Sequence, residues 1–75
     1  MQKIMIVEDD PAIREELALL LENEGYTPLV ITDFIDISAQ AALERPDLIL
    51  LDIGLPGKDG FSLCASLRKA IPAPV

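Results

Sequence analysis

The sequence has no histidine, a single cysteine and few basic residues, and each shortage excludes a class of site. Its 75 residues include 6 lysines and arginines against 13 aspartates and glutamates, so the formal net charge is −7. Because no basic patch can form, we expect no direct nucleic-acid contact by this segment. The lone Cys64 permits neither an intramolecular disulfide nor a cysteine-rich zinc site, and it fits a reducing cytoplasm.

Long apolar runs are also missing. The apolar opening of the chain reaches Glu8 at once, which is not the pattern of a signal peptide. No run approaches the ~20 apolar residues of a membrane span. We therefore expect a cytoplasmic chain without membrane contact. Apolar residues nevertheless make up 51% of the sequence, which is typical of one small globular domain and not of a disordered segment.

The apolar residues that are present follow two alternating patterns. Short apolar runs predict strands at residues 3–7, 27–31 and 48–51, and the last run is continuous, as in a strand buried on both faces of a parallel sheet. Pro28 suggests that the second strand lies at an edge. Helical spacing and capping residues predict helices from Asp10-Pro11 to Gly25, from Asp33 to about Glu44, and from a glycine-rich loop to about Ala70.

The resulting order is β-α-β-α-β-α. Such alternation predicts an α/β fold, with a parallel sheet, helices on both of its faces and right-handed crossovers. Residues 34, 37 and 41 are expected to point inward from the second helix. Cys64 lies on the apolar stripe of the third helix, and we expect it to be a core residue.

Acidic residues follow two of the predicted strands. Glu8, Asp9 and Asp10 come directly after the first strand, and Asp52 comes directly after the third. Parallel strands end at the same edge of the sheet, where ligands bind in open α/β folds. Carboxylates that converge there repel each other unless a cation joins them, and Mg²⁺ suits such a set. The alternative is that Asp10 only caps a helix while Glu8 and Asp9 are solvated loop acids.

At this point two segments carry a family resemblance. Residues 6–10 (IVEDD), followed by Ile13-Arg14, resemble the opening of response-regulator receiver domains, and residues 50–60 (LLDIGLPGKDG) resemble their phosphoacceptor loop. The separation between the two segments also fits. The resemblance runs the whole length of the chain and implies a flavodoxin-like (CheY-like) doubly wound sheet, here with strand order 2-1-3.

The resemblance also implies roles for the acidic residues. Asp52 would accept a phosphoryl group from a sensor histidine kinase, and the domain would control transcription through an effector domain absent from this chain. Asp9 would bind Mg²⁺ directly, Glu8 mainly through water, and the backbone carbonyl of Gly54 would be a further ligand. Pro56 and Gly60 would shape the loop. From its position on the first helix, Arg14 is expected to be a surface salt-bridge partner.

A complete receiver has five strands and five helices, with a Ser or Thr after the fourth strand and a Lys after the fifth. Both positions would lie beyond Val75, and Lys58 belongs to a different loop. We therefore expect residues 1–75 to be a receiver domain that is incomplete at its C-terminus. Its third strand would be an exposed apolar edge, which predicts a homodimer or larger assembly.

Two other functions compete with a phosphoacceptor module, which is not itself an enzyme. A hydrolase of the haloacid dehalogenase type also uses an aspartyl phosphate, but it places an Asp-x-Asp pattern after the first strand, where this chain has Glu8-Asp9-Asp10. The second alternative is a non-switching interaction fragment that binds a kinase or a partner regulator. It differs from the phosphoacceptor only in whether Asp52 is phosphorylated.

Overall fold

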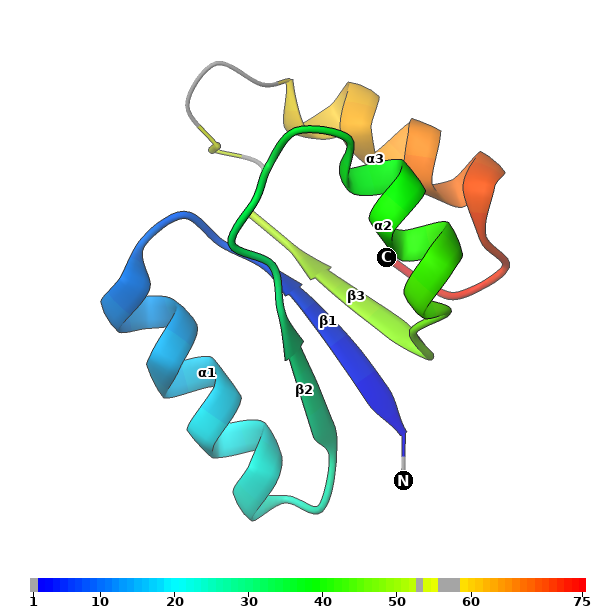
Figure 1. Ribbon diagram of the computed structural model, residues 1–75. Helices are drawn as coiled ribbons and strands as arrows, with labels where there is room; N and C mark the ends of the chain where they lie inside the picture. The colour runs from blue at the N-terminus through cyan, green and yellow to red at the C-terminus, as the bar shows by residue number, and fades with distance from the viewer. Residues whose placement is uncertain (1, 53, 56–58) are drawn as a thin grey trace.

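The computed structural model describes residues 2–52, 54–55 and 59–75 of the chain. Strands and helices alternate along it, as predicted (Figure 1). In chain order the elements are β1 (Lys3–Val7), α1 (Pro11–Asn23), β2 (Thr27–Val30), α2 (Ile37–Glu44), β3 (Leu48–Leu51) and α3 (Gly60–Ala70). None of the helices within the described ranges is long and apolar enough to cross a membrane.

The three strands form one parallel sheet in the order β2-β1-β3, which confirms the predicted order 2-1-3. The central strand β1 pairs with both neighbours, in a register that sets Ile4 beside Pro28 on one side and beside Leu48 on the other. Pro28 lies in an edge strand, as expected for a residue without a backbone N–H. The central position of β1 brings its end next to the end of β3.

The helices lie in separate layers, with α1 on one side of the sheet and α2 and α3 together on the other (Figure 1). Alternate residues of a strand point to opposite faces, and the odd-numbered residues of β1 and β3 face α2 and α3. That face holds the main core, and Met5 at its centre is fully buried. The core cluster consists of Met5, Val7, Ile31, Ile37, Ala41, Ile49, Leu55, Leu67 and Ile71.

The face covered by α1 is less well packed. Ile4 and Ile6 are buried beneath the helix, yet α1 itself contains no buried residue and Leu20 is 56% exposed. A groove lined by Ile6, Leu17 and Leu50 runs between α1 and β3. The apolar spacing of α1 therefore identifies the side that meets the sheet, but one helix does not cover the width of three strands.

Side-chain caps explain where α1 and α3 begin. The Asp10 carboxylate accepts hydrogen bonds from the backbone N–H groups of Ala12 and Ile13, and Pro11 takes the first helical position, as predicted. Asp59 caps α3 in the same way and also accepts a bond from the Ser62 hydroxyl at 2.8 Å. The Ser62 hydroxyl, followed by the N–H groups of Ser62 and Phe61, lowers the pKa of Asp59.

The predicted start of the second helix was wrong by three residues. The cap of α2 is Asp36, whose carboxylate accepts from Ala39 N, whereas Asp33 accepts from Ile35 N in a separate turn. Both aspartates can cap a helix, but the backbone of Asp36 has a φ of 29°, so a helix from Asp33 does not run through it. Ile37 and Ala41 are buried in the core, as expected. The second strand is also one residue shorter than predicted, because it ends at Val30.

The outer edge of β3 is more protected than the sequence predicted. Ile49 N donates to the carbonyl oxygen of Pro74 at 3.0 Å, so the segment that follows α3 lies along this edge. Pairing of this kind satisfies a backbone group that would otherwise be a template for another chain. Cys64 is half-buried on α3, so it lies at the margin of the core and not within it.

Candidate metal centre

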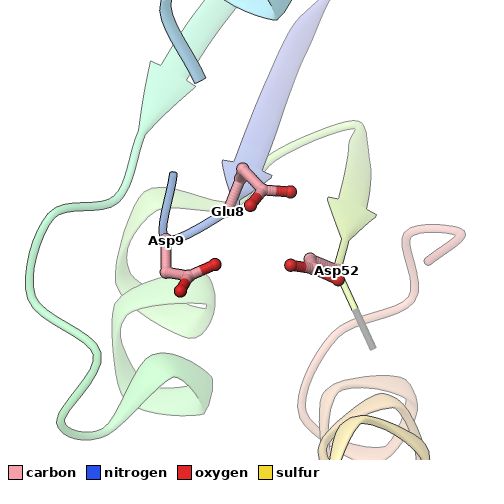
Figure 2. A group of neighbouring side chains, drawn as sticks. All are labelled: Glu8, Asp9 and Asp52. Carbon is pink, nitrogen blue, oxygen red and sulfur yellow. The ribbon is translucent and has the colours of Figure 1, made fainter. Parts of the chain in front are cut away.

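The candidate site lies at the carboxyl ends of β1 and β3. Val7 and Leu51 are paired in the sheet register, and Asp52 N donates to the carbonyl oxygen of Val7 at 3.0 Å. The residues that follow these two strands, Glu8 and Asp52, therefore leave the sheet side by side. Figure 2 shows their side chains, with that of Asp9, directed toward a common space.

Glu8, Asp9 and Asp52 form an acidic triad. Each offers a carboxylate oxygen, and these oxygens all lie within 4.8 Å of one another. Glu8 and Asp52 are half-buried and Asp9 is exposed. The predicted convergence of at least three carboxylates is confirmed.

Asp10 does not join the triad, because its carboxylate caps α1. Its backbone N–H instead donates to Glu8 Oε1 at 3.2 Å. Asp10 thus links the start of the helix to the acidic triad through its main chain. The capping role that the sequence left open for Asp10 is the one it takes.

Arg14 has a role that the sequence did not predict. Its Nη1 atom donates to the main-chain carbonyl oxygen of Glu8 at 3.3 Å. Within the part of the chain that the structure describes it forms no ion pair, so the expected salt bridge is not found there. The helical position of Arg14 relative to Glu8 was readable from the sequence, but a long side chain can reach either a carboxylate or a carbonyl. Nothing in the sequence pattern distinguishes the two.

Asp52 is held by the turn that follows it. The N–H of Gly54 donates to Asp52 Oδ1 at 2.8 Å, which orients the carboxylate at the end of β3. A Cβ atom at position 54 would lie 3.3 Å from the same oxygen, so glycine gives the carboxylate room. The expectations for Pro56 and Lys58 fall outside the described residues.

The charges of the triad affect one another. The Asp10 N–H lowers the pKa of Glu8 by binding its carboxylate, but partial burial and the adjacent charge of Asp52 outweigh it, so the pKa of Glu8 is raised. A raised carboxyl pKa is the response expected where like charges gather without a compensating cation.

The triad fits a hard divalent cation. Two oxygens on opposite sides of Mg²⁺ are about 4.2 Å apart, because each metal–oxygen bond is about 2.1 Å long. The carboxylate oxygens of the triad lie within 4.8 Å of one another, which suits direct contact with one or two carboxylates and contact through water with the rest. Mg²⁺ normally keeps several waters and uses few protein carboxylates.

Comparison with known proteins identifies the fold family. The sequence matches the family described as the response regulator receiver domain over residues 4–75. The chain belongs to the response-regulator receiver family. Receiver domains typically bind Mg²⁺ and do not form a family of conventional enzymes.

Individual receivers resemble the chain closely. It is 43% identical over 75 residues to the transcriptional regulatory protein YxdJ of Bacillus subtilis, covering 100% of this chain and 33% of that protein. The N-terminal domain of the nisin resistance regulator NsrR superposes with a TM-score of 0.87 at 39% identity, over 99% of this chain and 62% of that one. The chain spans about a third of the length of the curated relatives it matches.

A further solved relative concerns partners. The complex of histidine kinase ThkA with response regulator protein TrrA contains a chain that matches this receiver with a TM-score of 0.72 and 34% identity, over 92% of this chain and 60% of that one. Receiver domains therefore interact with histidine kinases.

Proposed function

We propose that this receiver accepts a phosphoryl group on Asp52 from a sensor histidine kinase, in a site that Mg²⁺ completes. The observation that carries the proposal is the position of Asp52 directly after β3, with its carboxylate within 4.8 Å of the carboxylates of Glu8 and Asp9. Phosphorylation would regulate transcription through an effector domain outside this chain, because relatives such as YxdJ are transcriptional regulators about three times as long.

The chemistry follows from the orientation of Asp52. An oxygen of its carboxylate attacks the phosphorus of the phosphorylated kinase histidine, an O–P bond forms as the N–P bond breaks, and the departing imidazole takes a proton from water. Gly54 N–H holds the carboxylate of Asp52, which is turned toward the carboxylates of Glu8 and Asp9. Positioning and electrostatics, more than covalent assistance, are what a protein contributes to phosphoryl transfer.

The metal ligands would be the carboxylates of Asp9 and Asp52, the backbone carbonyl of Gly54, and Glu8 mainly through water. Bound there, Mg²⁺ would neutralise charge on the transferred phosphoryl group. Without a cation, an incoming phosphoryl group would meet three carboxylates of the same sign.

Intact-protein mass spectrometry tests the proposal. Incubation with a small-molecule phosphodonor and Mg²⁺ should add one phosphoryl group, and Asp52→Asn should abolish the addition. Asp47→Asn is the matched control, because Asp47 lies at the other end of β3 and an asparagine oxygen can still accept from Lys3 N. Undiminished labelling of Asp52→Asn would contradict the assignment.

The extent of labelling distinguishes the alternative function. Labelling of the 75-residue chain should be weaker than that of a receiver carrying the family's later Lys and Ser or Thr. If neither the 75-residue chain nor the longer receiver is labelled, although the protein binds the kinase, the protein is instead the non-switching interaction module.

A further inference from the structure

Arg14 is tied to both sides of the turn between β1 and α1. Its backbone N donates to the carbonyl oxygen of Asp10 at 2.9 Å, which is the first helical hydrogen bond of α1. Its guanidinium reaches back across the turn to the carbonyl oxygen of Glu8 at 3.3 Å. The guanidinium is charged, so the bond is charge-assisted, and at 3.3 Å it is a long one.

The guanidinium of Arg14 binds a main-chain carbonyl and not the carboxylates of the triad. Among the described residues the only ion pair joins Lys3 to Glu44, at the opposite end of the sheet. Arg14, the positive charge of α1, therefore forms no ion pair with Glu8 or Asp9 among the described residues, and those carboxylates stay available to a cation.

Holding the Glu8 carbonyl also orients Asp9. That carbonyl belongs to the planar peptide unit that joins Glu8 to Asp9, so anchoring its oxygen sets the plane from which the Asp9 side chain extends. Asp9 is exposed, and packing against neighbours does little to direct it. The direction of its carboxylate depends on the main chain, which Arg14 holds.

We infer that Arg14 is a positioning residue for the acidic triad, holding Glu8 and Asp9 where a Mg²⁺ ion joins them to Asp52. The inference rests on the proposed function, since it assigns Arg14 to that same site. Arg14 has two effects on the affinity for Mg²⁺. Its charge repels a bound cation, and its hydrogen bond positions the carboxylates that bind the cation.

These two effects have opposite signs. If only charge mattered, removing Arg14 would make the site more negative and tighten Mg²⁺ binding. If Arg14 positions the triad, removing it weakens binding, and groups that orient metal ligands typically change affinity by about 10- to 100-fold. If Arg14 only stabilised α1, the melting temperature would fall while the Mg²⁺ affinity of the folded chain stayed constant.

The experiment is a Mg²⁺ titration of the whole chain, followed by calorimetry and by the NMR amide signals of Asp9 and Gly54, with metal-free melting curves measured alongside. Arg14→Met removes the donors and keeps an unbranched, helix-forming side chain. Arg68→Met makes the same change at an exposed position in the last turn of α3. Arg14→Lys keeps the charge and donates from a single nitrogen.

We expect Arg14→Met to weaken Mg²⁺ binding about tenfold, Arg68→Met to leave it unchanged, and Arg14→Lys to recover part of the loss. Unchanged or tighter binding by Arg14→Met would overturn the inference. If that variant does not fold, Arg14→Gln, which has a shorter and uncharged side chain, provides the same comparison. Wild-type protein that binds no Mg²⁺ would overturn the proposed metal site itself, which is a separate outcome.

Discussion

Replacing Asp9 with asparagine removes one of the three negative charges of the acidic triad and should change stability in opposite directions with and without Mg²⁺. In the metal-free protein the variant loses two repulsions, one from Glu8 and one from Asp52, and becomes more stable. In the presence of Mg²⁺ the variant lacks one of the metal ligands, so Mg²⁺ binding stabilises it much less than it stabilises the wild type. Asparagine keeps the size of the side chain, so charge is the main quantity that changes.

The distances in the triad set the size of the effect. Two unit charges separated by 4.8 Å repel by about 0.9 kcal/mol in water, and screening at about 0.1 M salt lowers this to about 0.5 kcal/mol. Two such repulsions give about 1 kcal/mol, which corresponds to a rise in melting temperature of about 4–8 °C for a domain of this size. At ten times its dissociation constant, Mg²⁺ stabilises the wild type by about 1.4 kcal/mol, enough to reverse the order of stability.

Thermal unfolding followed by circular dichroism can measure both effects. Each protein is melted in MgCl₂ and in NaCl of equal ionic strength, so that general screening cancels. Glu16→Gln, an exposed charge change in the middle of α1, is the control and should respond to Mg²⁺ as the wild type does. Equal gains from Mg²⁺ in wild type and Asp9→Asn would refute the ligand assignment. If Asp9→Asn without Mg²⁺ is no more stable than wild type without Mg²⁺, the proposed repulsion of Asp9 by Glu8 and Asp52 is refuted.

Three further predictions concern the core, the helix cap and association. Leu67→Ala at a fully buried position should cost about 2–5 kcal/mol in urea unfolding, whereas Leu20→Ala, at a position 56% exposed, should cost under about 1 kcal/mol; equal losses would contradict the unequal packing of the two faces. Since the pKa of Asp59 is lowered, its cap contributes above the ordinary aspartate value of 3.8 and is lost as the pH falls through the lower folded value. Asp59→Asn should lose that acid dependence of α3 stability, and identical acid-unfolding curves would argue against it. Self-association through the apolar third strand would have to extend or displace the Ile49–Pro74 hydrogen bond, and it should give a light-scattering mass above the monomer that Leu50→Lys reduces; a folded monomer whose mass is unchanged on about tenfold concentration would exclude it.

Some features of the fold and site were predictable because they depend on local sequence. The continuous apolar run at β3 and the Asp10-Pro11 start of α1 identify elements whose order implies a parallel sheet. Once the strands are parallel and β1 and β3 are neighbours, the acids that follow them meet at one edge. The acidic triad therefore follows from chain order together with the strand order 2-1-3, which the family resemblance implied.

Other features depend on contacts between distant parts of the chain. Asp33 and Asp36 are equivalent as capping residues, and the local sequence does not show which of them begins the helix. The hydrogen bond from Ile49 to Pro74 joins segments that no local pattern relates. The bond from Arg14 to the Glu8 carbonyl depends on the path of a flexible side chain, so a sequence pattern can place that residue near the site without revealing what it binds.

The main core extends from Met5 to Ile71, almost the whole length of the chain, and this has a consequence for synthesis on the ribosome. Contacts between residues so far apart in sequence form slowly, because a long loop must close before they are gained. While the first half of the chain is emerging, β1 has α1 and β2 beside it but lacks the partners of its other face. We therefore expect the nascent chain to gain its acidic edge only after β3 and α3 have left the exit tunnel.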